Sequence, residues 1–198
     1  MSITEKLLRT VESTEEHYNT GDYIFRENTM PQFYYQIVTG EVKLNSYSED
    51  GREFIQNILS DGACMGESML ILSKPYPVNA IALTSCVIVK VGRDHFFQLL
   101  QLHPHLFNDI YTALADNTFE KLSLMRTITA NNAEERLIEI MDLMKEFHDD
   151  KQKFSFEIPH TRQQLASLTG LSVETAIRAI KRLEKNNIVM IKDRKIYY

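Results

Sequence analysis

The apolar positions between residues 17 and 91 form short runs separated by turn residues. Such runs, bounded by Gly, Asp and Asn, are typical of strands that bury one face. Asp50-Gly51, between two alternating runs, indicates a hairpin. The sequence therefore predicts a small antiparallel sandwich or barrel, with strands over residues 23–25, 33–38, 42–44, 54–59 and 87–91. A short amphipathic helix is predicted before it, over residues 1–16, with Ile3, Leu7, Leu8 and Val11 on one side.

Between residues 95 and 144 the apolar residues recur at helical spacing. One helix opens with Phe96, Phe97, Leu99 and Leu100, and Pro104 then marks a new helix start. The second helix carries a long apolar seam, with Ile110 and Leu124 beside it. The seam consists of Phe107, Tyr111, Leu114, Leu122, Met125 and Ile128. Asn131-Asn132 interrupts the pattern, after which a helix over residues 133–147 and a short strand over 154–158 are predicted.

Residues 161–185 form two predicted short helices around a glycine. Leu165 and Leu168 give the first helix its apolar face, and Gly170 suits the left-handed conformation that ends a helix. Ser172 is a good N-cap for the second helix, whose buried stripe consists of Ala176, Ala179, Ile180 and Leu183. The opposite face carries Glu174, Arg178, Lys181 and Lys185. An ordinary helical hairpin would look similar, but a cationic second helix is typical of a helix-turn-helix that enters the DNA major groove.

The distribution of charge favours the DNA-binding interpretation. Residues 160–198 hold eight Lys and Arg against three Asp and Glu, whereas the whole chain has a formal net charge of −5. A basic end on an acidic body is expected when only one domain meets phosphate. Two short strands are predicted at 188–191 and 195–198. They would form a wing that places Lys192 and Arg194 on the DNA backbone.

Composition excludes several other classes. No apolar run approaches the roughly 20 residues of a membrane span, and the charged N-terminus lacks a signal-peptide core. Cys64 and Cys86 are too few for a disulfide scaffold or a four-thiolate cluster, so a cytoplasmic location is expected. No catalytic triad, P-loop or dinucleotide fingerprint occurs, so no enzyme activity is expected. A cupin-like metal enzyme would need several His and Glu ligands on the strands, and residues 17–91 contain only His17; no metal is expected.

Several short motifs follow one another in a fixed order. They are GDYIFRE at 21–27, YQIVTGEV at 35–42, GRE at 51–53, MGES at 65–68, TRQQLA at 161–166 and SVET at 172–175, followed by Arg178. Together they resemble the CRP/FNR family of bacterial transcription regulators over essentially the whole chain. The resemblance implies an α+β protein with an N-terminal antiparallel β-roll, or jelly roll, of the cyclic-nucleotide-binding type over residues 1–103. A dimerisation helix over 104–130 and a winged helix-turn-helix over 131–198 would follow. It also implies a homodimer on an inverted repeat in double-stranded DNA, with RNA polymerase as a partner.

By this resemblance, Glu174 and Arg178 match the base-reading pair of the family. A carboxylate can accept from cytosine N4, and a guanidinium can bond guanine O6 and N7. Val173 stands where the FNR branch also has valine, and with Ile177 it can touch only a thymine methyl group. The phosphate-contacting set would be Arg162, Ser172, Thr175 and Lys181. Gln163 would also bind DNA, and Lys192 and Arg194 of the wing would lie on the DNA backbone. Independently of the resemblance, the apolar seam could be buried in the same chain, which is the usual default, or against a second copy. The dimer is favoured because two recognition helices are normally set one helical turn apart, and it would pair through Phe107, Tyr111, Leu114, Leu122 and Met125.

The nucleotide cassette departs from the pattern of the family. Val78-Asn79-Ala80 occupies the place of Arg-Ser/Thr-Ala, whose arginine pairs with the cyclic phosphate, and the loop is one residue longer. A buried phosphate without a cationic partner is strongly disfavoured, and Lys74 nearby is a point charge rather than a bidentate fork. Lys121-Leu122 replaces the Thr-Ser pair that meets the adenine. We therefore expect no binding of cyclic AMP in the pocket formed by Gly66, Glu67, Ser68, Lys74, Val78 and Asn79.

The sequence leaves the effector open. Oxygen sensing of the FNR type needs clustered N-terminal cysteines, which are absent. A haem sensor needs an axial ligand, for which only His17, His95 or Cys64 could be suggested. No cofactor is predicted, and a regulator that binds DNA without a small ligand is equally open. The alternative within the family is a cyclic-nucleotide-responsive regulator with a rearranged phosphate cassette.

Overall fold

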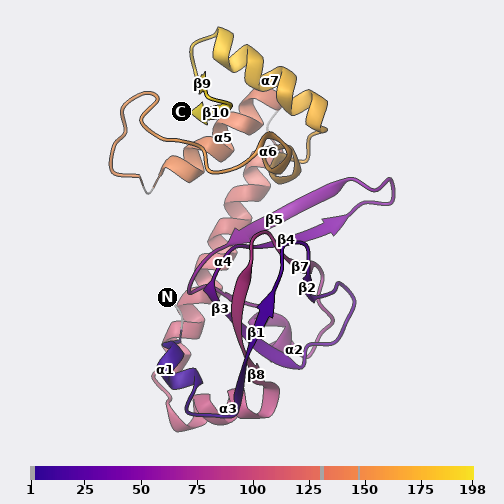
Figure 1. Cartoon of the computed structure of the whole chain (residues 1–198), viewed down its shortest axis with the longest axis vertical. Helices are drawn as coiled ribbons and strands as arrows, with labels where there is room; N and C mark the ends of the chain where they lie inside the picture. The colour runs from indigo at the N-terminus through magenta and orange to yellow at the C-terminus, as the bar shows by residue number, and fades with distance from the viewer. Residues whose placement is uncertain (1–2, 130–131, 147) are drawn as a thin grey trace. The chain divides into compact units, whose positions relative to one another are not determined.

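The computed structural model describes residues 3–129, 132–146 and 148–198, without the side chains of 126–129 (Figure 1). The chain divides into two compact units. Unit 1 comprises Met1–Ser46 and Gln56–Phe119, and unit 2 comprises Tyr47–Ile55 and Glu120–Tyr198. The boundary between the units, near residue 119, lies inside a long helix and coincides with neither predicted domain limit. The limits at 103 and 130 therefore stay predictions.

Two four-stranded sheets make up most of unit 1, and residues 47 and 53–55 of the second sheet belong to unit 2. In the first, the strand order is β1 (Ser13–Tyr18), β8 (Cys86–Gly92), β3 (Phe33–Thr39) and β6 (Cys64–Met65). In the second, it is β2 (Tyr23–Phe25), β7 (Asn79–Ala82), β4 (Val42–Tyr47) and β5 (Glu53–Leu59). Neighbouring strands such as β1–β8, β3–β8 and β4–β7 run antiparallel. The predicted antiparallel sandwich is confirmed, and each of the five predicted strands coincides with an observed one.

Strand β3 shows how the first sheet is buried on both faces. Tyr35 and Ile37 lie in the core between the two sheets. Tyr34 lies in a second core, shared with α1 (Glu5–Leu8), α3 (Arg93–Leu102) and α4 (Leu106–Thr129), because successive strand side chains point to opposite faces. There its ring stacks on Phe96 with 4.5 Å between ring centroids. The helices predicted after residue 95 therefore cover the outer face of this sheet.

The predicted helix over residues 1–16 is wrong for most of its length. Among residues 3–16, only α1 is helical, and its Leu8 is buried together with Ile3. From Ser13 to Tyr18 the chain forms β1, which pairs along its whole length with β8. No side chain of β1 is fully buried, so its sequence lacks the apolar alternation that would predict a strand. The distant partner strand determines this segment. Strands β6 and β7 and helix α2 (Glu67–Leu72) are likewise absent from the prediction.

Unit 2 contains the helices α5 (Ala133–Lys145), α6 (Arg162–Thr169) and α7 (Val173–Lys185) and the hairpin of β9 (Met190–Lys192) and β10 (Lys195–Tyr197). Its core consists mainly of Leu137, Ile140, Met141, Leu165, Leu168, Ala176, Ala179, Ile180, Leu183 and Ile196. The predicted strand over 154–158 is wrong. Phe154 has a φ of 64°, and the segment makes one isolated bridge, between Glu157 and Tyr197. The predicted end of the preceding helix, Phe147, lies outside the described residues.

Candidate nucleic-acid interface and effector cassette

The ends of α6 are fixed by short-range hydrogen bonds. The Gln164 amide donates to Thr161 Oγ1 at 3.2 Å, and the Thr161 amide donates to Gln164 Oε1 at 2.8 Å, which is a capping box. Gly170 ends the helix at φ 65°, as predicted. The Leu171 amide donates to the Ala166 carbonyl at 2.9 Å. The turn between α6 and α7 is therefore closed by the backbone.

Helix α7 begins at the predicted cap. The Thr175 amide donates to Ser172 Oγ at 3.2 Å, and Ser172 Oγ donates to Thr175 Oγ1 at 2.9 Å. The predicted stripe of Ala176, Ala179, Ile180 and Leu183 is buried. The cap and this stripe fix the rotation of the helix, which leaves its other side to solvent.

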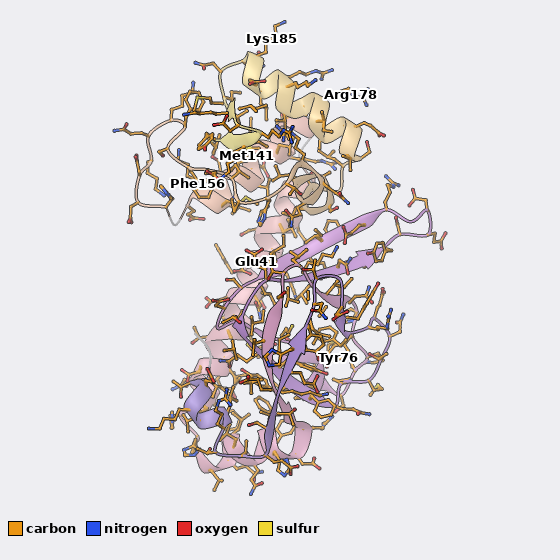
Figure 2. All side chains as sticks on the ribbon, in the orientation of Figure 1. Glu41, Tyr76, Met141, Phe156, Arg178 and Lys185 are labelled. Carbon is orange, nitrogen blue, oxygen red and sulfur yellow. The ribbon has the colours of Figure 1, made fainter. Side chains whose placement is uncertain are left out.

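The exposed side of α7 brings together most of the predicted DNA-binding residues. Val173, Glu174, Arg178 and Lys181 are exposed, and Ile177 and Thr175 are half-buried. Figure 2 labels Arg178 and Lys185 on this helix. Arg182 Nη1 lies 3.4 Å from Glu134 Oε1 of α5. In the described part of the chain, Glu174, Arg178 and Lys181 have no side-chain partner, so their polar groups are available to a ligand.

A hairpin lies where the wing is predicted, although its first strand begins at Met190 rather than at residue 188 and extends to Lys192. Lys192 lies opposite Lys195 in the β9–β10 register, and Asp193-Arg194 forms the loop between them. Lys195 Nζ lies 2.6 Å from Glu157 Oε1, and the Tyr197 hydroxyl donates to Glu157 Oε2 at 3.0 Å. These bonds lower the pKa of Glu157, with the hydrogen bond from Lys195 as the main cause. Arg162 Nη1 donates to the Arg194 carbonyl at 3.0 Å, a contact that sequence reasoning did not find.

Helix α4 carries apolar side chains on two sides. Leu106, Ile110 and Ala113 are buried in the core of unit 1, and Leu114 packs partly against it. Four predicted interface residues are exposed in the single chain: Phe107 (38%), Tyr111 (63%), Leu122 (61%) and Met125 (62%). Phe119, which is absent from the predicted seam, is also exposed. The side chain of Ile128 lies outside the described residues.

The cassette centres on a buried carboxylate. Glu67 is 2% exposed at the start of α2, after Gly66 with φ 77°. Its Oε1 accepts from Ser68 Oγ at 3.2 Å and from Asn117 Nδ2 of α4 at 3.2 Å. Its Oε2 is buried and has no hydrogen-bond partner among the described residues. One carboxylate oxygen thus ties α2 to α4, and the other is left unsatisfied.

The rest of the predicted pocket contains no cation. Val78 and Asn79 are buried, whereas Lys74 is exposed. The Asn79 side chain is already used: its Oδ1 accepts from the Glu27 amide at 3.0 Å, and its Nδ2 donates to the Asn45 carbonyl at 3.3 Å. The structure therefore gathers Gly66, Glu67 and Ser68 around the carboxylate and leaves Lys74 in solvent.

An aromatic pair occupies space beside Gly66. The Tyr76 ring stacks on Phe25 with 3.9 Å between centroids and 13° between planes. A Cβ atom on Gly66 would lie 2.8 Å from Tyr76 Cε1. Burial is the main cause that raises the pKa of Tyr76, so its hydroxyl stays protonated. This hydroxyl is buried and unpaired among the described residues. Sequence reasoning missed Tyr76 and Asn117, and the only signal was an aromatic residue between Pro75 and Pro77.

The described residues contain no group of three or more His, Cys, Asp and Glu placed to hold a metal ion. None of the helices described is long and apolar enough to cross a membrane. Cys64 is buried, and burial raises the pKa of its thiol to about 12.

Comparison with known proteins supplies two domain matches. The cyclic nucleotide-binding domain matches residues 15–103, and the Crp-like helix-turn-helix domain matches residues 135–197. Together they account for more than half of the chain, in the order that the motifs predict. The chain belongs to the CRP/FNR family.

Individual CRP/FNR relatives span most of the chain. The cAMP-activated global transcriptional regulator CRP of Haemophilus influenzae is 25% identical over 157 residues, covering 78% of this chain and 70% of the relative. Its namesake from Salmonella typhimurium is 24% identical over 177 residues, covering 87% and 83%. The c-di-GMP responsive global regulator CLP of Xanthomonas campestris has a TM-score of 0.81 at 22% identity, covering 98% and 96%.

These findings confirm two of the predictions. The fold is α+β, with a cyclic-nucleotide-binding-like β-roll, a long helix and a C-terminal helix-turn-helix. The chain is a transcription regulator of the CRP/FNR type and not an enzyme. The individual site residues stay predictions.

Proposed function

We propose that the chain is a cytoplasmic homodimer that binds an inverted repeat in double-stranded DNA, reads bases with Glu174 and Arg178, and does not respond to cyclic AMP. RNA polymerase is the proposed partner on DNA. The observation that carries the proposal is the exposed face of α7, on which Glu174 and Arg178 are free of partners in the described part of the chain.

The chemistry of this face suits a major groove. Glu174 can accept from cytosine N4, and Arg178 can donate two parallel bonds to guanine O6 and N7. Val173 offers an apolar contact to a thymine methyl group, with Ile177 behind it. The phosphate-contacting residues would be Arg162, Gln163, Ser172, Thr175, Lys181, Lys192 and Arg194. For Ser172 and Thr175 the contact would use hydroxyls that already bond each other in the free chain.

The exposed side of α4 supports the dimer. Tyr111, Leu122 and Met125 are each more than half exposed although they lie on one apolar stripe of the helix. Apolar patches of this kind mark association surfaces in soluble proteins. A two-fold axis along α4 would bury the stripe against its own copy, and the same symmetry would give the dimer two recognition helices for the two halves of an inverted repeat.

The composition of the cassette argues against cyclic AMP. A cyclic phosphate would meet Val78 and an Asn79 whose amide is already bonded, and it would find no buried cation. The Tyr76 ring also occupies space next to Gly66. One observation favours the alternative, a cyclic-nucleotide-responsive regulator with a rearranged cassette: Glu67 Oε2 is buried without a partner among the described residues and could accept from a ligand hydroxyl.

Selection of bound duplexes from a random DNA pool tests the proposed function. The expected product is an inverted repeat with a G·C pair at the same position of each half-site and half-site centres about 34 Å apart. Enrichment of single, unrepeated half-sites would contradict the dimeric reading. Failure to enrich any sequence would contradict sequence-specific binding.

A further inference from the structure

The tip of the β9–β10 hairpin has residues that its backbone does not favour. Asp193 and Arg194 form a two-residue loop with φ values of 49° and 65°. Hairpin loops with positive φ at both positions normally carry Asn-Gly or Asp-Gly, because most side chains are strained there. Arginine in place of glycine at the second position therefore costs stability. Strain kept at a surface turn points to a function that requires the side chain.

The same tip gathers positive charge. Lys192 and Lys195 lie directly opposite each other, an arrangement that destabilises a sheet when the charges are alike. Glu157 neutralises Lys195. Lys192 and Arg194 are exposed and, within residues 148–198, have no acidic partner. The tip keeps a net positive charge even with Asp193 in the turn, and such a tip is suited to a polyanion.

Arg162 ties this tip to the helix-turn-helix. Its Nη1 donates to the Arg194 carbonyl at 3.0 Å, across 32 positions of sequence. Arg162 is the first residue of α6, and α6 packs against α7. A charge-assisted hydrogen bond to the carbonyl of a strained residue holds that residue in place. The loop is thus fixed relative to the proposed recognition helix.

We propose that the hairpin is a second DNA-reading element, in which Arg194 enters the minor groove beside the half-site and Arg162 is the residue that positions it. The inference rests on the proposed binding of α7 in the major groove, and it goes beyond a phosphate contact by the wing. An element held beside a major-groove helix meets the phosphate strand that borders the groove, and the minor groove lies on the other side of that strand. Lys192, at the base of the loop, would contact this strand, and Arg194, at the tip, would reach past it.

The expected consequence is a preference for A·T pairs outside the half-sites. A·T-rich DNA has a narrow minor groove, whose negative potential attracts guanidinium groups. A G·C pair places the guanine N2 amino group in that groove, where it obstructs an inserted side chain. The recognition helix faces the major groove and cannot contact the N2 position of these flanking pairs, so only a preference that Arg194→Ala removes belongs to the hairpin.

Three duplexes that differ only in the flanking base pairs test the proposal. They carry A·T, G·C or inosine·C pairs beside the half-sites that the full chain selects. Inosine lacks the N2 amino group, so inosine·C resembles A·T in the minor groove and G·C in the major groove. By fluorescence anisotropy at fixed salt, the chain should bind the A·T and inosine·C duplexes roughly fivefold more tightly than the G·C duplex.

Three variants then assign the roles. Arg194→Ala should abolish the flank preference and leave the half-site preference unchanged. Arg162→Ala should do the same, and Asp193→Asn in that background should restore part of the flank preference, because asparagine favours the same turn. Lys153→Ala, which removes an exposed cation from the loop before α6, is the matched control and should keep both preferences.

The outcomes separate this inference from the proposed function. Equal binding of the three duplexes, with half-site discrimination intact, overturns the inference alone. A uniform loss of affinity in Arg194→Ala, with the flank preference kept, leaves Arg194 with only the phosphate contact of the proposed function and also overturns the inference. A chain that discriminates neither half-sites nor flanks contradicts the proposed function itself.

Discussion

At the scale of the residue, Glu174 and Arg178 are four positions apart and project from one side of α7. Replacing Arg178 with alanine removes a bidentate contact to one base pair. We expect Arg178→Ala to lose about 1–3 kcal/mol of binding free energy per half-site and to relax the preference for one G·C pair. Repeating the selection with the variant measures this. The same sites chosen with undiminished discrimination would show that Arg178 does not read bases.

Lys181→Ala is the matched variant, since it removes a cation from the same exposed face. We expect it to weaken binding to all sequences alike and to flatten the salt dependence by about one unit per contact. Titrations of one selected and one scrambled duplex at several salt concentrations give both quantities. A change in sequence preference on this substitution would assign Lys181 to the bases instead.

Some features of the cassette follow from the identity of single residues and were predictable from the sequence, whereas others depend on distant contacts. The sequence shows that position 78 lacks an arginine, and it predicts that the loop residue Lys74 is exposed. The sequence does not predict where the Tyr76 side chain lies. Its amide donates to the Thr29 carbonyl at 3.0 Å, and its carbonyl accepts from the Asn28 amide at 2.8 Å, so contacts almost 50 positions away set the path of its loop. No local pattern encodes such contacts.

At the scale of the element, the ends of helices and the turns were predictable from the sequence wherever residues close in sequence fix them. Ser172, Thr161 and Gly170 fix the ends of α6 and α7 through bonds to residues within five positions. Asp50-Gly51 fixes the turn between β4 and β5, where the Gly51 amide donates to the Ser48 carbonyl at 2.8 Å. Strand β1 has no such signal, because its ladder partner β8 lies more than 60 positions along the chain. Its structure follows from tertiary pairing rather than from propensity.

Helix α4 allows a direct test of the dimer. Met125→Glu would place two like charges near the proposed two-fold axis, so we expect monomers and weaker operator binding. Leu114→Glu should have the same effect, but Leu114 also packs on the core of unit 1, so a lower thermal stability is expected with it. Sedimentation at micromolar concentration measures the oligomeric state of both variants, and thermal melting measures the loss of stability.

Thr112→Glu is the matched control, because it adds the same charge to an exposed position away from the seam. It should leave the protein dimeric. A wild-type chain that sediments as a monomer at micromolar concentration would refute the pairing along α4.

At the scale of the whole molecule, the order of the domains was predictable because each carries its own motifs. The response to an effector was not predictable from the sequence, because it depends on which side chains occupy the interior of the β-roll. We expect isothermal titration with cyclic AMP or cyclic GMP to show no saturable binding, because none of the buried residues that the structure describes carries a cation for the phosphate. A dissociation constant near or below about 10 μM, about −7 kcal/mol, would favour the alternative reading. Loss of that binding in Lys74→Ala would then assign the phosphate to the loop lysine.

The stacked ring of Tyr76 has a consequence for engineering the protein by chemical complementation. Tyr76→Gly would delete the atoms of one p-cresol molecule next to Phe25, in a place where the ring is 3% exposed. Buried cavities with apolar walls take up small aromatic molecules from solution. We expect this variant to melt at a lower temperature and to recover stability when p-cresol is added, whereas the wild type should not respond. Added toluene would show how much of the rescue needs the hydroxyl. The β-roll would then respond to a ligand chosen by the experimenter.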